Sequence, residues 1–313
     1  MVTGGAGFIG SHLVDHLMEE GGMVTVWDNL SAGRIERLAK WKGSESRFAL
    51  EKEDLTNANL TIPRECETIY HLAANPEVRI GTESPSVHFE QNIVTTHNLL
   101  EAARKAANAR TIVFASTSTV YGEPKKIPTP EDYGPMKPIS TYGASKLASE
   151  ALISAYASTY GLRAVIYRLA NVIGPGSTHG VIYDFIQKLR EDPSRLEILG
   201  DGTQTKSYLH VKDCVRALLA GLAEPDQRVS IFNVGSEDQV NVTKIAEIVC
   251  REMGLRDVKL SLRSVTKDGR GWVGDVKVML LDVSALKRLG WKAEMNSEEA
   301  VVSAARQMVP SHH

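Results

Sequence analysis

Residues 1–10 read Met1-Val-Thr-Gly-Gly-Ala-Gly-Phe-Ile-Gly10, and this stretch decides the fold. Gly4, Gly7 and Gly10 recur at three-residue intervals after a short apolar start. One glycine lets the chain turn sharply, one lets the backbone approach a pyrophosphate, and one lets the following helix pack closely against the strand. The helix predicted over 11–20 would present its free amide groups to that pyrophosphate.

A second strand is predicted over 23–27, and it ends in Asp28. An acidic residue at this distance from the glycines can accept both hydroxyls of an adenosine ribose. It would also repel a 2′-phosphate, so the pattern predicts NAD rather than NADP. Arg34 leaves NADP open as the cofactor, because a nearby arginine can bind the 2′-phosphate.

Strands and helices continue to alternate along the chain. Further strands are expected at 47–50, 67–72, 110–115 and 163–168, and helices at 84–107, 140–160, 211–222 and 243–253. Such alternation predicts an α/β fold with a doubly wound parallel (Rossmann) sheet, whose ligands bind outside the carboxyl ends of the strands. We expect an NAD-binding domain over 1–174 and a smaller α/β lobe over 175–313 that mainly binds substrate, with segments near 203–235 returning to the large domain.

Composition excludes several classes of function. A formal net charge of −2 on 313 residues provides no electrostatic footprint for nucleic acid or an anionic membrane. We find no apolar run as long as a transmembrane helix. Cys66, Cys214 and Cys250 are scattered without metal-ligand spacing, so no metal site is expected and a reducing cytoplasm is the natural compartment.

Tyr142 and Lys146 are candidates for acid–base chemistry, because residues four apart on a helix share one face. A neighbouring ammonium lowers the pKa of a phenol and can turn it into a base at neutral pH. Such a pair is also common on solvated helices. The segment Ser116-Thr-Ser-Thr-Val-Tyr-Gly122 follows a buried strand, where its hydroxyls either face the cofactor crevice or satisfy their own backbone.

Six segments together resemble the extended short-chain dehydrogenase/reductases: TGGAGFIG, DNL at Asp28, HLAAN, STSTVYG, YGASK and RLANVIGP. Within that group the chain is most similar to the UDP-glucose 4-epimerases of archaea. The resemblance implies NAD-dependent epimerisation at carbon 4 of a UDP-hexose, between UDP-glucose and UDP-galactose, through a transient 4-keto sugar. It also implies a homodimer joined through a four-helix interface, for which the helices expected at 84–107 and 140–160 are the candidates.

The resemblance assigns roles to individual residues. Tyr142 would be the general base, Lys146 would bind the nicotinamide ribose and lower the pKa of Tyr142, and Thr117 would be the catalytic hydroxyl. The implied cofactor-binding residues are Gly4, Gly7, Phe8, Ile9, Gly10, Asp28, Asn29, Asp54, Leu55, Leu72, Ala73, Ala74, Asn92, Ser116, Tyr142 and Lys146. The implied substrate-binding residues are Thr117, Ser118, Asn171, His179, Gly180, Val181, Ile182, Lys206, Tyr208, Arg270, Asp275 and Met279.

The same residues also bear on whether the chain catalyses one of the other reactions known for related enzymes. Sugar-nucleotide dehydratases carry Asp-Glu directly after the catalytic threonine, where this chain has Ser118 and Thr119, which argues against dehydration. UDP-glucuronate 4-epimerase or decarboxylase activity stays open, because it depends on one positive charge near the sugar. A catalytically inactive NAD-sensing regulator on the same fold is a different class of function. Regulators of that kind tend to lack the tyrosine or the lysine, and both are present here.

Overall fold

A seven-stranded parallel sheet forms the larger part of the molecule. The computed structural model describes residues 1–223 and 227–309. The strands of this sheet are β1 (Val2–Thr3), β2 (Val24–Trp27), β3 (Phe48–Glu51), β4 (Thr68–His71), β5 (Thr111–Thr117), β6 (Arg163–Leu169) and β11 (Val229–Val234). Their order across the sheet is β11-β6-β5-β4-β1-β2-β3, and every neighbouring pair is parallel.

The strand order reverses direction between β1 and β4, which are neighbours in the sheet. Connections from β1 run outward to β2 and β3, whereas those from β4 run the opposite way to β5 and β6. In such sheets the crevice at the reversal point, beyond the carboxyl ends of the strands, is where ligands bind. The doubly wound α/β fold expected from the sequence is thereby confirmed.

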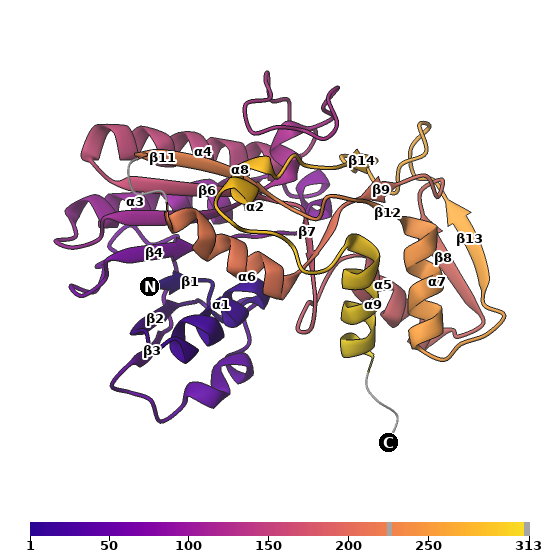
Figure 1. Ribbon diagram of the computed structural model, residues 1–313, viewed down its shortest axis with the longest axis horizontal. Helices are drawn as coiled ribbons and strands as arrows, with labels where there is room; N and C mark the ends of the chain where they lie inside the picture. The colour runs from indigo at the N-terminus through magenta and orange to yellow at the C-terminus, as the bar shows by residue number, and fades with distance from the viewer. Residues whose placement is uncertain (224–226, 310–313) are drawn as a thin grey trace.

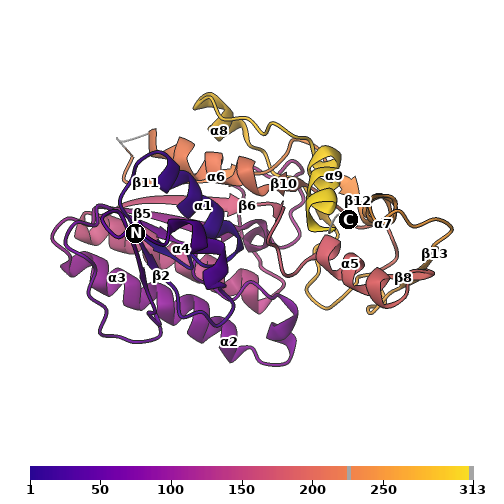
Figure 2. The same cartoon turned by 90° about the horizontal axis from the view of Figure 1, so that it is seen from below.

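Helices cover both faces of the sheet. Helices α1 (Phe8–Glu19) and α6 (Val211–Ala220) lie on one face, and α3 (Thr95–Lys105) and α4 (Thr141–Tyr160) lie on the other (Figures 1 and 2). In β6, Val165 and Tyr167 belong to the core under α1 and α6, whereas Ile166 belongs to the core under α3 and α4. Successive side chains of a strand point to opposite faces of the sheet. Because helices cover both faces here, the side chains on either face are mostly apolar.

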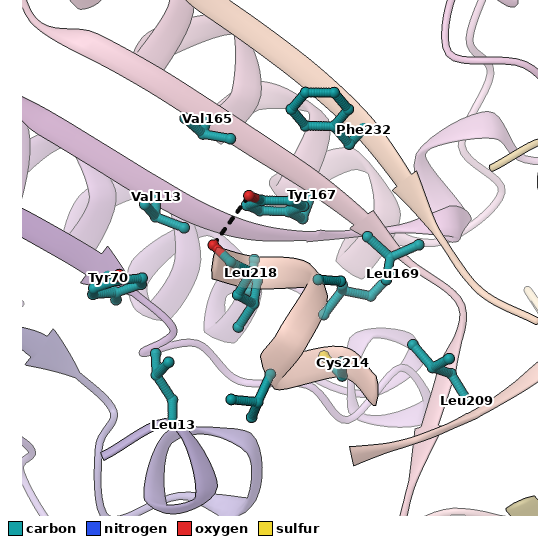
Figure 3. Packing of buried hydrophobic residues seen from close by; sticks show 14 of the residues in the cluster. Leu13, Tyr70, Val113, Val165, Tyr167, Leu169, Leu209, Cys214, Leu218 and Phe232 are labelled. Atoms are coloured by element: carbon teal, nitrogen blue, oxygen red, sulfur yellow. Dashed lines mark hydrogen bonds between the residues drawn. The ribbon is translucent and has the colours of Figure 1, made fainter. Parts of the chain in front are cut away.

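Figure 3 shows the core on the face covered by α1 and α6. Val165 and Tyr167 of β6 point toward Leu218 of α6, and Leu13 approaches from α1. The Tyr167 hydroxyl donates a hydrogen bond of 3.0 Å to the backbone carbonyl of Leu218. The phenol is therefore satisfied inside an otherwise apolar layer.

The helix expected over 84–107 is divided into three segments. Helix α2 (Ser86–His88) leads into a π-helical stretch, η3 (Phe89–Val94), and only then into α3. The wider turn carries Asn92, whose amide donates to Ser145 on α4 at 2.9 Å and whose oxygen accepts from the Asn75 amide at 2.7 Å. Single π-turns often occur at functional sites, and here the turn ties the loop after β4 to α4.

Short 3₁₀-helices complete the large domain. They are η1 (Ile35–Trp41), η2 (Arg79–Thr82), η4 (Ser118–Tyr121) and η5 (Gly221–Ala223). The smaller lobe has its own core, formed where three helices pack on one side of the parallel strand pair β8 and β13 (Figure 1). Its elements are α5 (Val181–Glu191), β8 (Arg195–Leu199), α7 (Val242–Glu252), β13 (Lys259–Arg263) and α9 (Ser297–Met308).

Several short strands lie between the two parts. They are β7 (Asn171–Ile173), β9 (Thr205–Lys206), β10 (Tyr208–His210), β12 (Val240–Asn241) and β14 (Val278–Met279), followed by helix α8 (Ser284–Arg288). Strand β10 pairs with β7, and the chain then passes through α6 to β11 at the edge of the large sheet. The domain boundary expected after residue 174 stays a prediction. The last residues of the lobe expected over 175–313, residues 310–313, lie outside the described part of the chain.

Candidate active site

A cleft of about 460 Å³ lies at the carboxyl ends of the central strands and extends under the smaller lobe. Most of the residues singled out in the sequence line it. They are Gly4, Gly7, Phe8, Ile9, Gly10, Leu72, Ala74, Ser116, Thr117, Ser118, Tyr142, Lys146, Asn171, His179, Gly180, Val181, Ile182, Lys206, Tyr208 and Asp275. Eight others lie outside its wall, namely Asp28, Asn29, Asp54, Leu55, Ala73, Asn92, Arg270 and Met279.

The glycine-rich turn forms one end of the cleft. Gly4 has φ of +69°, and a Cβ there would lie 2.8 Å from the Ala73 backbone nitrogen. A Cβ on Gly10 would overlap the Gly4 carbonyl oxygen. Both positions therefore exclude any larger residue, and α1 begins beside the turn with no side chain capping its amides. This bare cradle fits the pyrophosphate of a dinucleotide.

Asp28 follows β2 and is buried beside the turn. One carboxylate oxygen accepts a hydrogen bond of 3.0 Å from the Ala6 amide, and the other accepts one of 2.8 Å from the Leu30 amide. A carboxylate offers about four lone-pair sites. Asp28 can therefore hold the turn in place and still accept the hydroxyls of a ribose.

Asn29 and Asp54 meet at the outer end of this region. The Asn29 side chain donates to the Asp54 carboxylate at 3.1 Å. The backbone amide and hydroxyl of Thr56 also donate to Asp54, at 2.9 and 2.7 Å, and these hydrogen bonds lower the pKa of its carboxyl. Leu55 is buried, and its carbonyl accepts from the side chain of Asn98. The cluster therefore lies beside the cleft, and its side chains are engaged with one another and with neighbouring backbone.

Tyr142 lies in the first turn of α4, where the Ser140 side chain caps the helix by accepting from the Gly143 amide. Burial raises the pKa of the Tyr142 phenol to about 12, and a hydrogen bond with Thr117 opposes this effect. Its ring lies 5.7 Å from the ring of His88. The base and the hydroxyl expected to act together are therefore adjacent.

Lys146 lies one turn further along α4 and is 4% exposed. Burial lowers the pKa of its ammonium to about 7, although the charge of Glu150 opposes the change. The Nζ atom lies 4.4 Å from the centre of the Phe114 ring. In the protein without ligand, burial dominates the pKa of Tyr142 and raises it, so the lowering by Lys146 that the resemblance implies stays a prediction for the filled site.

A buried ion pair lies directly behind Lys146, and the motifs did not reveal it. Arg168 donates to both carboxylate oxygens of Glu150 at 2.8 to 3.1 Å, and both residues are under 5% exposed. Ser116 also donates to Glu150, while Arg168 reaches the Tyr121 hydroxyl at 2.8 Å. This network joins β5, α4 and β6 behind Thr117 and Lys146. Its only signal in the sequence is a carboxylate four residues after Lys146 on a buried helix face.

Asn92 is placed differently from the expected role in cofactor binding. Its side chain is 2% exposed and is fully engaged with Asn75 and Ser145. The wider turn of η3 directs it toward α4, so it supports the wall of the cleft from behind. Ala73 likewise faces the glycine-rich turn through its backbone.

The smaller lobe provides the other side of the cleft. Asn171 donates to the Ser207 carbonyl at 3.2 Å. The Lys206 ammonium lies 2.7 Å from the Asp275 carboxylate and 5.4 Å from the centre of the Trp272 ring. Burial raises the pKa of the neighbouring phenol, Tyr208. Lys206 thus lines the cleft with its charge already paired.

Arg270 and Met279 are not part of the cleft wall. The Arg270 guanidinium contacts Glu123 and Asp268 at 2.5 Å each, and it donates to the Asp275 carbonyl. With these partners it holds the loop around Asp275 rather than an open phosphate position. Met279 is 7% exposed and packs into the core beneath the sheet.

The mouth of the cleft holds charged residues that the sequence analysis missed. Arg79 lies 3.0 Å from Glu77 on its own loop and 3.7 Å from Asp184 on α5, so it connects the two sides. Burial raises the pKa of Asp184 and lowers that of His179. Arg37 lines the cleft near the glycine-rich turn. Glu77, Arg79, Asp184 and Arg37 belong to no motif with fixed spacing, whereas His179 is already a candidate from the resemblance.

Within residues 1–223 and 227–309, no three His, Cys, Asp or Glu side chains are grouped so that they could hold a metal ion. The helices in the same ranges are all too short or too polar to cross a membrane.

Comparison with known proteins places this geometry in a family. The model of the NAD dependent epimerase/dehydratase family matches residues 1–235. A solved structure of a UDP-galactose 4-epimerase is 47% identical, with a TM-score of 0.86, over 98% of this chain and 97% of that chain. A putative UDP-glucose 4-epimerase of Methanocaldococcus jannaschii is 33% identical over 308 residues, which cover 96% of this chain and 95% of the relative.

A relative with a different activity is similarly close. UDP-glucuronic acid decarboxylase 6 of Arabidopsis thaliana is 35% identical over 311 residues, which cover 96% of this chain and 86% of the relative. The glycine-rich cradle, the Tyr142–Lys146 helix and these matches agree, and the resemblance inferred from the motifs is confirmed. The chain belongs to the NAD-dependent epimerase/dehydratase family.

Proposed function

We propose that this protein interconverts UDP-glucose and UDP-galactose by NAD-dependent epimerisation at carbon 4. The observation that carries the proposal is the group of Tyr142, Thr117 and Lys146 in one cleft with the glycine-rich cradle. The similarity to named UDP-galactose and UDP-glucose 4-epimerases supports the choice of substrate. Hydride acceptance and return is the chemistry that NAD supplies when bound.

On this proposal, side chains of the protein carry out the proton transfer. Tyr142 takes the proton from the hydroxyl on sugar carbon 4. It returns the proton after the 4-keto sugar has rotated within the site to present its opposite face. Thr117, which shares a hydrogen bond with Tyr142, orients that hydroxyl. We assign to Lys146 the tasks of holding the nicotinamide ribose and stabilising the phenolate. On this assignment Tyr142 works only once the site is filled, because in the protein alone its pKa is about 12.

Binding of the remaining groups follows from the cleft wall. We assign the adenosine ribose to Asp28 and the nucleotide diphosphate of the substrate to Asn171 and Lys206. The stretch His179 to Ile182 at the start of α5 would hold the uridine. This assignment requires the Lys206 ammonium to leave the Asp275 carboxylate and to contact a phosphate of the substrate instead.

Dehydration is a poorer fit to the same wall. Ser118 and Thr119 line the cleft where dehydratases need an acid and a base. The Thr119 amide and hydroxyl both pair with the Thr117 hydroxyl, at 3.2 and 3.1 Å. Thr119 thus holds the Thr117 hydroxyl in place, and neither Ser118 nor Thr119 has a carboxyl that could act as the extra acid or base.

The direct test incubates purified enzyme with UDP-galactose and identifies the product by chromatography. UDP-glucose is the expected product, and UDP-N-acetylglucosamine and UDP-glucuronate complete the panel. Turnover of UDP-glucuronate without any product from UDP-galactose would replace the proposal with the decarboxylase or uronate epimerase reading. A protein that holds NAD but converts none of the sugars would favour the regulator.

Replacing Tyr142 with Phe tests the base. Activity should fall at least a hundredfold, the lower range for loss of a general base, while NAD stays bound. Tyr156→Phe is the matched control on the same helix, because its hydroxyl donates to Glu101, away from the cleft. Normal turnover by the Tyr142 variant would exclude the assigned role.

We further propose a homodimer built on the outer faces of α3 and α4. Ala151 and Ala155 are exposed on α4, and Phe89 on the adjoining π-turn is 57% exposed. Small exposed side chains let helices approach closely, and an exposed phenylalanine gains from burial. Light scattering should show a dimer that Ala151→Glu converts to a monomer, whereas Ala39→Glu leaves it intact. A monomeric wild type would refute the interface.

A cytoplasmic location is part of the same proposal. Cys66, Cys214 and Cys250 are free and buried, which suits a reducing compartment.

A further inference from the structure

The loop between β7 and α5, residues 174–180, crosses over the start of α1. Gly174, Gly176 and Gly180 in this loop have φ of +151°, +87° and +93°. Only glycine adopts such angles readily, so the loop follows a path that most residues would resist. Its second half, from Ser177 onward, lines the cleft.

Arg37 fastens this loop to the glycine-rich turn. Its Nη1 donates to the Ala6 carbonyl at 3.1 Å, and its Nη2 donates to the Gly176 carbonyl at 2.5 Å. The side chain is half-buried and lines the cleft. One guanidinium therefore bridges the segment that cradles a pyrophosphate and the segment that covers it. The planar guanidinium suits this task, because its donors lie on separate nitrogens in a fixed geometry.

His12 makes a second connection of the same kind. Its Nε2 lies 3.0 Å from the Pro175 carbonyl, so the ring nitrogen is the donor. The His12 ring also packs edge-on against Phe8, whose own ring lies near Gly176. Two consecutive carbonyls of the loop are thus held by side chains of the large domain.

We propose that Arg37 is a cofactor-retention residue, which keeps the loop 174–180 closed over the bound dinucleotide. The inference rests on the proposed function, because an epimerase must keep its NAD until the hydride has been returned. Cofactor exit requires the loop to lift from the glycine-rich turn. Both hydrogen bonds of Arg37 must break before the loop can do so.

The test measures release of NAD in the absence of any sugar. Purified enzyme is loaded with NAD, separated from free cofactor and diluted, and the bound fraction is followed by rapid filtration and chromatography. Arg37→Gln should release NAD about 10- to 150-fold faster, the range expected for a lost charged hydrogen bond. His12→Phe, which loses a neutral hydrogen bond, should release it about 2- to 13-fold faster.

Arg37→Lys separates the effect of the two hydrogen bonds from the effect of a positive charge near the phosphates. A lysine keeps the positive charge near the phosphates, but its donors all lie on one nitrogen, so it loses the fork that serves the Ala6 and Gly176 carbonyls from two separate nitrogens. Release as fast as from Arg37→Gln supports the proposal, and release as slow as from the wild type overturns it. Lys42→Gln, at an exposed cation just after η1, is the control and should release NAD like the wild type. Urea unfolding of each cofactor-free variant shows whether its fold is intact.

Release from Arg37→Gln at the wild-type rate would overturn the retention role and leave the proposed function standing. A wild-type protein that retains no NAD at all would overturn both. Failure to epimerise any sugar, with slow NAD release that Arg37→Gln accelerates, would reject only the proposed function.

Discussion

Replacing Lys146 with Met should make the cofactor-free protein more stable, although it removes a residue of the candidate active site. Lys146 is almost fully buried, and burial lowers its pKa from 10.5 to about 7. At about 1.4 kcal/mol per pKa unit, this difference corresponds to a cost of roughly 5 kcal/mol for holding the ammonium inside the fold. Methionine has a similar length and no charge to bury.

The pH dependence of this cost has a definite sign. Below pH 7 the folded and unfolded chains both carry the proton, so the full cost is present. Between pH 7 and 10.5 the unfolded chain binds more protons than the folded one, and the stability of the wild type rises with pH. Above 10.5 both states are neutral and the cost disappears. The advantage of the Met variant should therefore be about 4 kcal/mol at pH 7 and about 2 kcal/mol at pH 9.

Urea unfolding of the cofactor-free proteins, followed by circular dichroism at both pH values, measures this difference. Lys105→Met, at an exposed lysine near the end of α3, is the control and should change stability by no more than about 0.5 kcal/mol at either pH. A Lys146→Met protein that is less stable than the wild type at pH 7 would contradict the reasoning. So would an advantage of the same size at both pH values.

Three further perturbations test the core and the turn. Arg168→Met should cost about 3–5 kcal/mol in urea unfolding, because it leaves the buried Glu150 carboxylate unpaired, and adding Glu150→Gln should recover most of the loss; a double variant as unstable as the single one would disprove the pairing. Tyr167→Phe should cost about 1 kcal/mol, since the Leu218 carbonyl loses its donor, and an unchanged unfolding midpoint would count against that bond. Gly4→Ala should weaken NAD binding in a direct titration, because a Cβ would press on the backbone after β4; wild-type affinity would show that the turn can relax.

The fold was predictable because its signals are local. The glycines of residues 1–10 and the apolar strand over 110–115 each report their environment within a few positions, and both lie as expected. The helical stretch expected over 84–107 is confirmed from Ser86 to Lys105, but its π-helical turn was not expected, because the apolar spacing on either side of the turn is that of an ordinary α-helix. Only the contacts of Asn92 with another helix reveal why the wider turn is there.

The candidate site was predictable where a motif fixes spacing and not where distant segments meet. Tyr142 and Lys146 are one turn apart on a single helix, so their proximity follows from helical geometry alone. Arg270 contacts Glu123 from 147 positions away, and no local pattern encodes such a partner. The same holds for Arg37, whose contact with Gly176 spans 139 positions. The direction of the Tyr142 pKa was also beyond the sequence, because it depends on burial.

Strand β11 completes the edge of the large sheet beside β6, yet sixty positions separate the end of β6 at Leu169 from the start of β11 at Val229. During synthesis at roughly 5–20 residues per second, those positions take on the order of 3–12 s to emerge. Throughout that interval β6 is an open edge, with unpaired amide and carbonyl groups on a strand whose middle residues, 164–167, are largely apolar. The nascent chain therefore exposes this edge to aggregation while residues 170–228 are being made, and a chaperone that binds nascent chains would find its target at β6.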